Sequence, residues 1–311
     1  MQIISTDELN RRIRDSAEEL INEAEKAYES KLLEAAEVLR ENVSTKPIVL
    51  LSGPSGSGKT TSALRIEAIL DGWGCETHTL SMDSYFLPAS ETPDAVDENG
   101  EVDYESPLRL DTELLNDHLE KIANCEEIEI PKFNFVEQKR EKGRKLLRKP
   151  GELVVIEGIH ALNPDITGKS YGFATGVYVS VRTRVQNSAG ELLHPSKIRV
   201  MRRLMRDVEQ RGRKPAETLD MFRSVERGEN LYIMPYKHRA HFDIDTFFSY
   251  EVPLYRKRLI PVFEELSRSY GSYERFAEVL EFLHELEPLD PALVPQNSLI
   301  REFIGGSNFE Y

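Results

Sequence analysis

The sequence predicts an α/β fold with a mainly parallel sheet, and two observations support this. From Ile48 onward, short apolar runs typical of strands alternate with stretches of helical periodicity, the order found in parallel sheets covered by helices. A glycine-rich segment at residues 53–60 lies between the first such run and the first helix. With 311 residues, 40% of them hydrophobic, the chain is long enough to bury the core that this fold needs.

The spacing of apolar residues sets the individual elements. Runs of apolar and β-branched side chains predict five strands, at residues 48–51, 76–80, 153–156, 176–181 and 243–248. Apolar residues three or four positions apart predict helices at residues 60–70, 112–122, 196–210 and 254–269, and Pro261 should bend the last of these. Residues 87–107 contain three prolines and seven acidic residues, so we expect a long loop beside the functional site.

The remaining segments predict the domain organisation. Residues 6–41 have apolar side chains three, four or seven positions apart, typical of one or two amphipathic helices. We therefore expect a helical N-terminal arm at residues 1–45, the α/β domain at residues 46–266, and a C-terminal helical segment and tail at residues 267–311. The arm could pack on the main domain or on a second copy of the chain, so a homo-oligomer stays open.

The charge of the chain argues against some partners. With 40 Lys and Arg against 54 Asp and Glu the net charge is −14, so most of the surface should repel nucleic acid and anionic membranes. No apolar run approaches the roughly 20 residues of a membrane span, and residues 1–10 do not resemble a signal peptide, so we expect a cytoplasmic protein. Residues 132–149 and 196–214 each hold eight basic and two acidic residues, which predicts a compact anionic ligand.

The segment Gly53-Pro54-Ser55-Gly56-Ser57-Gly58-Lys59-Thr60 matches the phosphate-binding pattern G-x-x-x-x-G-K-[ST] in full. In this P-loop, or Walker A motif, backbone N–H groups and the following helix N-terminus face the phosphates of a nucleoside triphosphate. Lys59 would bridge the outer phosphates and the Thr60 hydroxyl would bind Mg²⁺. The predicted nucleotide-binding residues of this segment are Gly53, Ser55, Gly56, Ser57, Gly58, Lys59, Thr60 and Thr61.

Two acidic residues at strand ends complete the predicted reaction centre. Asp83 follows the strand at residues 76–80, at the edge where open parallel sheets bind ligands, and its carboxylate can accept the proton of an attacking hydroxyl. Glu157 follows the strand at residues 153–156 and is placed to hold Mg²⁺ or its waters. We therefore predict Asp83 as the general base, and Thr60, Glu157 and Asp83 as the metal ligands.

An arginine cluster favours phosphoryl transfer over hydrolysis. In a helix at residues 196–210, four arginines share a face opposite the apolar one, and two more follow: Arg199, Arg202, Arg203, Arg206, Arg211 and Arg213. Such a lid would close over the triphosphate and exclude water, as a kinase requires. The sequence contains no Asn-Lys-x-Asp motif, which argues against a GTPase, whereas a mechanical ATPase stays open. Arg206 joins Asp83 and Lys59 as a predicted catalytic residue.

These motifs together resemble the uridine kinase and phosphoribulokinase family of P-loop kinases, and most of all the bacterial uridine-kinase-like nucleoside kinases. The resemblance runs from about residue 47 to residue 266, with a further match at residues 301–307. Besides the P-loop, its carriers are Ser81-Met82-Asp83-Ser84-Tyr85-Phe86, Asp103-Tyr104-Glu105-Ser106-Pro107, Pro131-Lys132-Phe133-Asn134-Phe135, Glu157-Gly158-Ile159-His160, Arg202-Arg203-Leu204-Met205-Arg206-Asp207, Arg211-Gly212-Arg213 and Pro235-Tyr236-Lys237.

The resemblance implies a P-loop NTPase fold with a five-stranded parallel sheet, an arginine-rich lid and a small acceptor-binding hairpin, which suits residues 128–149. It implies ATP- and Mg²⁺-dependent phosphorylation of a primary hydroxyl of a small molecule, for uridine or cytidine the 5′-OH. Arg206 and Arg211 would contact the phosphates. The residues that would hold the acceptor are Asp103, Phe133, Phe135, Gln138, Arg140, Arg203 and Arg213.

The departures from the family pattern lie mostly on the acceptor side. Phe133 and Gln138 stand where uridine kinases read the pyrimidine with a Tyr and a His, which changes the available hydrogen bonds. Tyr85-Phe86 reverses the usual order, Met221 replaces a Gln and His241 an Asp. We predict a small-molecule kinase with a nucleoside acceptor, and a kinase for another polyol or sugar-like acceptor is the alternative. An ATP-binding regulatory or scaffold protein is the alternative of another class.

Overall fold

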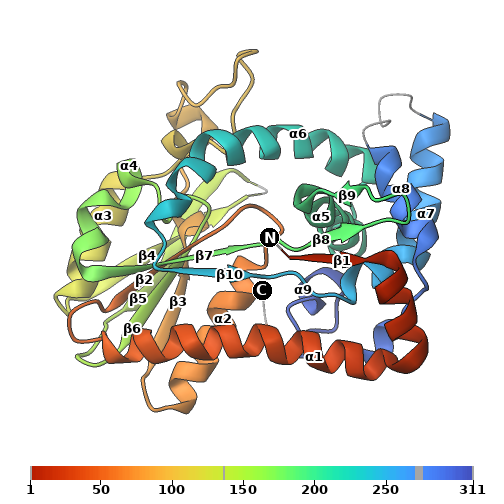
Figure 1. Cartoon of the computed structure of the whole chain (residues 1–311). Helices are drawn as coiled ribbons and strands as arrows, with labels where there is room; N and C mark the ends of the chain where they lie inside the picture. Colours follow the sequence, from red (N-terminus) through yellow and green to blue (C-terminus); the bar gives the residue numbers. More distant parts are fainter. Residues whose placement is uncertain (1, 136, 270–275, 310–311) are drawn as a thin grey trace.

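A computed structural model describes residues 2–135, 137–269 and 276–309. Its centre is a five-stranded, all-parallel sheet with the strand order β10–β7–β2–β6–β3 (Figure 1). The strands are β2 (Ile48–Ser52), β3 (Thr77–Ser81), β6 (Leu153–Glu157), β7 (Ala174–Ser180) and β10 (Phe242–Asp245). Each overlaps one of the predicted strands, and the sheet confirms the predicted fold class.

The central strand β2 is buried on both faces of the sheet. Ile48 and Leu50 face the side covered by α3 (Thr112–Ala123). Val49 and Leu51 face the side covered by α1 (Thr6–Glu41) and α2 (Lys59–Gly72). Successive side chains of a strand point to opposite faces, so a strand covered on both sides reads as one continuous apolar run. This is the signal that predicts β2 from the sequence.

The four helices predicted within the α/β domain are present as α2, α3, α5 (Pro195–Gln210) and α7 (Glu251–Ser269), which contains Pro261. The long helix α6 (Pro215–Tyr232), at the top of Figure 1, is not among the predicted helices. Its buried face continues from Val225 to Gly228, which has no side chain. The apolar period is therefore short, and the sequence signal for this helix is weak.

The N-terminal arm forms one long helix, α1, whose 36 residues include a kink at Ser16 (φ −164°, ψ 99°). The helix begins after Ser5, whose hydroxyl accepts a hydrogen bond from the Glu8 N–H and caps the first turn. It runs along α2 across the bottom of Figure 1. The hydroxyls of Tyr28 and Ser62 are 2.7 Å apart and join α1 to the helix that follows the P-loop.

A second, small sheet that the sequence does not predict has the order β1–β8–β9. Its strands are β1 (Ile3–Ser5), β8 (Arg184–Gln186) and β9 (Leu192–Leu193). β1 pairs with β8 in parallel, with Ile3 opposite Arg184. Strands of two or three residues are too short to show an alternation of apolar and polar side chains, so no sequence pattern announces them.

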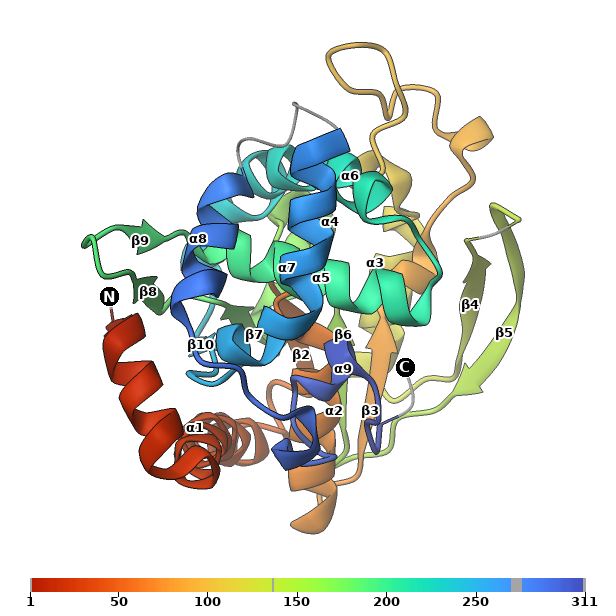
Figure 2. The same ribbon diagram turned by 90° about the vertical axis from the view of Figure 1, so that its right-hand side faces the viewer.

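The hairpin implied by the family resemblance is present and stands apart from the main sheet (Figure 2). It consists of β4 (Ile128–Asn134) and β5 (Lys139–Leu146), paired antiparallel with a register shift between Ile130 and Lys132. The shift surrounds Pro131, which has no N–H to donate to the ladder. The predicted loop at residues 87–107 extends past α6 (Figure 1) and contains one short 3-10 helix, η2 (Ala89–Glu91).

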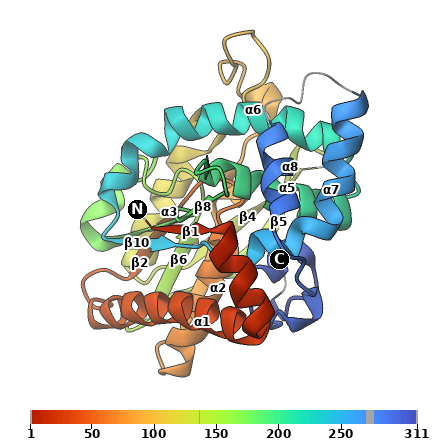
Figure 3. The ribbon, with the colours of Figure 1, turned by 45° about the vertical axis from the view of Figure 1, so that its right-hand side comes forward.

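The remaining elements are short. The helices are α4 (Pro164–Thr167), α8 (Ala277–Glu285) and α9 (Arg301–Ile304), and the 3-10 helices are η1 (Met82–Tyr85), η3 (Pro107–Arg109), η4 (Gly168–Phe173), η5 (Met234–Arg239) and η7 (Pro291–Leu293). α7 and α8 pack together at one side of the molecule (Figure 3), and α9 returns to α5. Within the described ranges, no helix combines the length and the apolar character needed to cross a membrane.

Candidate functional site

The P-loop folds back over the carboxyl end of β2. Gly56 and Gly58 have φ angles of 77° and 83°, which glycine adopts without steric cost. At Gly53 a Cβ atom would collide with the backbone oxygen of Val179 on the neighbouring strand β7. The glycines that the motif requires are therefore needed for the shape of this loop.

Two polar groups of the site support a phosphate ligand. The Ser57 hydroxyl is buried and has no hydrogen-bond partner among the described residues, and the same holds for the Nε of Arg203. Unpartnered buried polar atoms are rare and costly unless a ligand or water completes them. The Lys59 ammonium lies 3.3 Å from the Pro54 carbonyl oxygen, folded against its own loop. The loop thus fits the triphosphate expected from its sequence.

The two predicted acidic residues lie next to one another at the edge of the sheet. Asp83 is in η1, directly after β3, and Glu157 ends β6. β3 and β6 are paired with Ser81 opposite Glu157, and the Ser81 hydroxyl donates a hydrogen bond to the Glu157 carboxylate. The predicted oxygen ligands for Mg²⁺ are hydroxyl and carboxylate groups, which suit a hard divalent cation.

Loss of hydration raises the pKa of both carboxyl groups in the ligand-free protein. It raises the pKa of Glu157 to about 7, against the opposing charge of Lys59. Asp83 is exposed to solvent, yet protein crowds it closely enough that loss of hydration raises its pKa, again opposed by Lys59 and then by Arg211. A bound cation would favour the ionised forms, so metal binding to this site should release protons.

Glu105 is a site residue that the sequence reasoning does not assign. Burial raises the pKa of Glu105 to about 7, with Arg203, Lys59 and Asp83 among the charges acting on it. It therefore belongs to the same cluster as Asp83. It stands in the Asp103-Tyr104-Glu105-Ser106-Pro107 motif, and this motif is the sequence signal that could have identified it.

Asp103, predicted to hold acceptor hydroxyls, is instead enclosed by protein. It is 1% exposed, and its Oδ2 lies 2.8 Å from Arg227 Nη2 and accepts a hydrogen bond of 3.0 Å from the Tyr232 hydroxyl. The Glu105 N–H donates to its other oxygen at 3.1 Å. In this structure Asp103 fixes the segment at residues 103–107 to α6. Glu105 is the acidic residue of that segment on which the charge of Lys59 acts.

The arginines of α5 divide into two groups. Arg202 is fully buried, donates to both Glu251 carboxylate oxygens at 2.8 and 2.9 Å, and donates to the Gly56 carbonyl oxygen at 3.1 Å. Arg199 pairs with Glu229 and donates to the Ser55 carbonyl oxygen at 3.1 Å. The chain itself therefore supplies the anions opposite these two arginines, which support the P-loop from outside.

The second group acts on the acidic residues of the site, Arg203 on Glu105 and Arg211 on Asp83. Arg203 donates to the Ser55 hydroxyl, and burial, then the nearby Arg206, lowers the pKa of Arg203 to about 10. Arg206, Arg211 and Arg213 gather around Asp207, with nitrogen–oxygen distances of 3.4, 3.4 and 3.8 Å. With Glu302, which lies 3.8 Å from Arg206, two carboxylates face three cations, so this group keeps a net positive charge for a ligand.

An aromatic cluster forms the acceptor side. Phe86, Phe133 and Phe135 have ring centroids 5.0 to 6.0 Å apart, and Phe135 is 53% exposed. Gln138, at the turn of the hairpin, accepts a 3.2 Å hydrogen bond from Arg109 and donates to the Phe135 carbonyl oxygen at 2.9 Å. Its amide therefore holds the turn in this structure, and the ring of Phe135 is the exposed member of the cluster.

Two further predicted positions have structural partners. Arg140 forms a 2.8 Å ion pair with Asp111 and donates to the carbonyl oxygens of Tyr85 and Phe86, which ties the hairpin to η1. His241 accepts a hydrogen bond from the Gly176 N–H through Nδ1. Met221 is exposed on α6.

The C-terminal segment reaches the P-loop from the opposite side. Leu299 is fully buried against Gly58, where an added Cβ would lie 2.5 to 2.9 Å from its side chain. Thr61 donates a 2.5 Å hydrogen bond to Glu302, whose second oxygen lies 3.8 Å from Arg206. The sequence match at residues 301–307 was the only signal for this contact.

The sequence profile of the phosphoribulokinase / uridine kinase family matches residues 48–252, the span that holds the P-loop, Asp83, Glu157 and the arginines of α5. The chain belongs to this family. It is thus a P-loop small-molecule kinase, as predicted. The family match leaves out α1 and the C-terminal segment that contacts Gly58 and Thr61.

Individual relatives agree with the phosphoribulokinase / uridine kinase assignment. A uridine kinase from Ligilactobacillus salivarius is 31% identical over 206 residues, covering 65% of this chain and 84% of the relative. A uridine kinase from Halobacterium salinarum is 27% identical over 191 residues, covering 61% and 76%. A solved structure from Silicibacter sp. TM1040, described as a candidate fructose transport system kinase, has a TM-score of 0.52 at 16% identity and covers 68% of this chain and 98% of its own, which shows a common fold.

Proposed function

We propose that the protein transfers the γ-phosphoryl group of ATP to a primary hydroxyl of a nucleoside, with the 5′-OH of uridine or cytidine as the leading acceptor. The observation that carries the proposal is the convergence of Asp83, Lys59 and the P-loop at one edge of the sheet, beside an open aromatic surface at Phe135. The uridine kinases among the relatives support a nucleoside as the acceptor.

Each residue has a role in this proposal. The amides of the P-loop, with Ser55 and Thr61, bind the phosphates of ATP, and Lys59 with Arg206 and Arg211 balances their charge. Asp83 accepts the proton of the acceptor hydroxyl. Mg²⁺, held by Thr60, Glu157 and Asp83, would neutralise charge on the transferred group.

The acceptor lies between the hairpin and α6 in this proposal. Phe135 offers an exposed aromatic face on which a planar base can stack, and the buried Phe133 packs against it. Gln138 and Arg140 hold the hairpin in place. Arg203 and Arg213, with their positive charge, face the hydroxyl groups. Asp103 contributes indirectly, by fixing Glu105 through its backbone N–H.

A second acceptor class has one observation in its favour. The Gln138 amide is engaged on both sides by Arg109 and by the Phe135 carbonyl, so it is not free to read the edge of a base. A polyol or sugar-like acceptor has no base, so its binding does not require hydrogen bonds from Gln138 to a base edge.

Release of ADP from Mg·ATP, measured with a panel of nucleosides and a panel of sugars and polyols, tests both. Turnover with uridine or cytidine at least tenfold above every sugar supports the nucleoside assignment. A sugar or polyol turned over faster than all nucleosides replaces it with the second class.

A further inference from the structure

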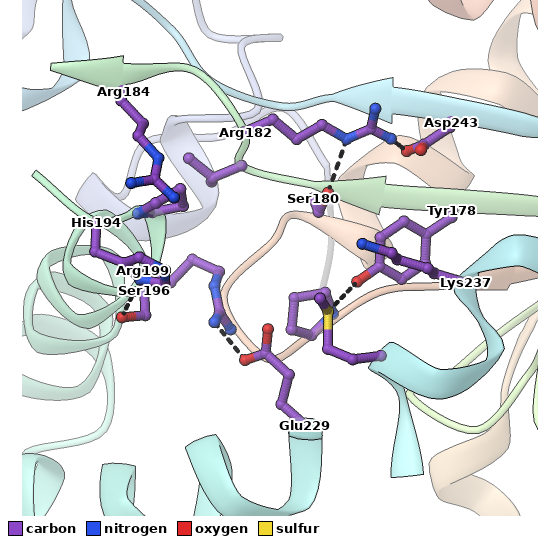
Figure 4. Close-up of a pocket in the computed structure, with 14 residues that line it drawn as sticks. Tyr178, Ser180, Arg182, Arg184, His194, Ser196, Arg199, Glu229, Lys237 and Asp243 are labelled. Carbon is purple, nitrogen blue, oxygen red and sulfur yellow. Dashed lines mark hydrogen bonds and ion pairs between the residues drawn. The ribbon is translucent and has the colours of Figure 1, made fainter. Parts of the chain in front are cut away.

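A cavity of about 320 Å³ lies behind the P-loop at the carboxyl end of β7 (Figure 4). Its walls come from β7, from the segment that leads into β8, from the start of α5 and from η5. Pro54 is the P-loop residue that lines it, whereas Lys59, Asp83 and Glu157 do not. The cavity is therefore separate from the reaction centre.

Two cations in this cavity lack a counter-charge. Arg184, half-buried, and Lys237, exposed, approach the cavity from opposite sides (Figure 4). Within the part of the chain that the structure describes, neither side chain has a hydrogen-bond or ion-pair partner. The other charges of the cavity cancel in two ion pairs, Arg182–Asp243 and Arg199–Glu229. The cavity thus carries about two positive charges in a chain whose net charge is −14.

His194 adds a neutral hydrogen-bond donor to the same wall. The Ser196 backbone N–H donates to His194 Nδ1 at 3.2 Å, so the neutral ring carries its proton on Nε2. Burial, and then the charges of Arg184 and Arg199, lower the pKa of His194 and so favour the neutral ring. The N-terminus of α5, at the adjacent Pro195, carries the positive end of the helix dipole and adds to the positive potential of the cavity.

We propose that this cavity binds a small phosphate monoester, with Arg184 and Lys237 on the phosphate. A phosphate monoester carries about −1.5 to −2 charges at pH 7, which two unpaired cations balance, whereas a single carboxylate would leave one of them uncompensated. Tyr178, Met234 and Pro54 form an apolar wall for the organic part of the ligand. The volume limits that part to about the size of a nucleoside or a sugar.

Histidine NMR signals can separate this site from the reaction centre. His194 lines the cavity, and His160 lies beside the acceptor side, where its Nε2 is 3.0 Å from the Glu105 carbonyl oxygen. Uridine 5′-monophosphate, inorganic phosphate and uridine are titrated onto the full chain labelled at histidine. The monophosphate and phosphate should shift the His194 signal saturably, the monophosphate at the lower concentration, and uridine should leave it unchanged. Equal affinity for monophosphate and phosphate would identify free phosphate as the ligand and overturn the monoester.

Substitutions then assign the contacts. Arg184→Gln and Lys237→Gln should each weaken the monophosphate response of His194 about tenfold, the loss expected for one charged hydrogen bond. The response of His160 should remain. Lys257→Gln, which removes an exposed lysine of α7, should change neither signal, and thermal unfolding checks that each variant folds.

Three further outcomes would overturn the proposal. The first is that millimolar monophosphate does not shift the His194 signal. The second is a shift that neither substitution weakens. The third is a shift that disappears when the protein is saturated with the Mg²⁺ complex of a non-hydrolysable ATP analogue. The last result would make the cavity part of the nucleotide site. All three are binding measurements, so they stand whether or not phosphoryl transfer to a nucleoside is detected.

Discussion

At the scale of single residues, the site gathers three carboxyl groups around one lysine. Asp83, Glu105 and Glu157 each have a raised pKa, and burial is the largest cause for all three. The opposing charge of Lys59 acts on every one of them. Asp83 is the one proposed as the general base, so the removal of its charge is the most direct test of the reaction centre.

Asp83→Asn should reduce kcat by about 10²–10⁴-fold, the range expected for loss of a general base, because the amide cannot accept the proton. ATP without Mg²⁺ should still bind within a fewfold of the wild-type affinity, since the P-loop is unchanged, whereas the affinity for Mg·ATP should fall by the loss of one of the three proposed Mg²⁺ ligands. The measurements are ADP release and calorimetric nucleotide titration. Asp94→Asn, in the exposed loop, is the matched control. A kcat above a tenth of the wild-type value would remove Asp83 as the base.

Glu105 should make the ligand-free protein less stable as the pH rises. Its pKa is about 4.5 when unperturbed and about 7 in the folded protein, so folding favours its protonated form. This contribution is fully present below about pH 4.5 and is lost as the pH passes 7. At most about 3 kcal/mol is involved, at about 1.4 kcal/mol for each pKa unit, and solvent screening of a partly exposed group lowers it.

Thermal unfolding between pH 4.5 and 8 measures this effect. The melting temperature of Glu105→Gln relative to wild type should rise with pH and level off above 7. Glu101→Gln, an exposed neighbour, should show a difference that does not depend on pH. A flat difference for Glu105→Gln as well would contradict the assigned pKa.

Residue type and neighbours along the chain predict the P-loop, Asp83 and Glu157, because each stands beside a strand that the apolar pattern reveals. The same reasoning cannot separate Arg202 from Arg206. Arg202 is neutralised by Glu251, 49 positions away, and burial of that pair depends on how α5 and α7 pack. Spacing along one helix contains no information about a partner on another.

At the scale of elements, α6 connects the arginine cluster to the acceptor side through close packing. Gly228 allows α6 to approach Glu105, where an added Cβ would overlap the Glu105 Cβ and lie 2.9 Å from its Cγ. Tyr232, one turn later, holds Asp103. The sequence shows neither contact, because a glycine on a helix face leaves a gap in the apolar pattern.

Gly228→Ala should therefore displace Glu105 or α6 and lower the free energy of unfolding by about 1–3 kcal/mol, as overpacking does. The acceptor KM should rise several-fold while nucleotide affinity stays near wild type. Gly72→Ala, in α2, has nothing within 4 Å of the added atom and should be neutral or stabilising. Denaturant unfolding and steady-state kinetics give both quantities, and a Gly228→Ala variant as stable and active as Gly72→Ala would refute the packing argument.

At the scale of the whole molecule, the nucleotide loop is held between distant parts of the chain. α5 supports it through Arg202, and the segment at Leu299 and Glu302 closes it from the other side. The predicted boundary after residue 266 stays a prediction, but these contacts support a nucleotide site that includes residues 299–302.

Leu299→Ala should weaken Mg·ATP binding at least tenfold and destabilise the fold by about 2–5 kcal/mol, because it leaves a cavity against Gly58. Leu293→Ala, at a 38% exposed position, is the control and should change little. Glu302→Gln keeps the volume and should weaken nucleotide binding severalfold with a near-normal melting temperature, because Thr61 and Arg206 lose a charged partner. Unchanged nucleotide affinity in both variants would show that the segment has no part in the site.

The hydrogen bond between Thr61 and Glu302 spans 241 positions of the chain, and this bears on how the protein is made. A ribosome releases the P-loop long before it reaches residue 302, so the growing chain carries Gly58 and Thr61 without their covering. Contacts this far apart form late because a large loop must close first. During synthesis the nascent chain should consequently bind nucleotide only once residues 299–302 have emerged. ATP binding would then depend on completion of the fold.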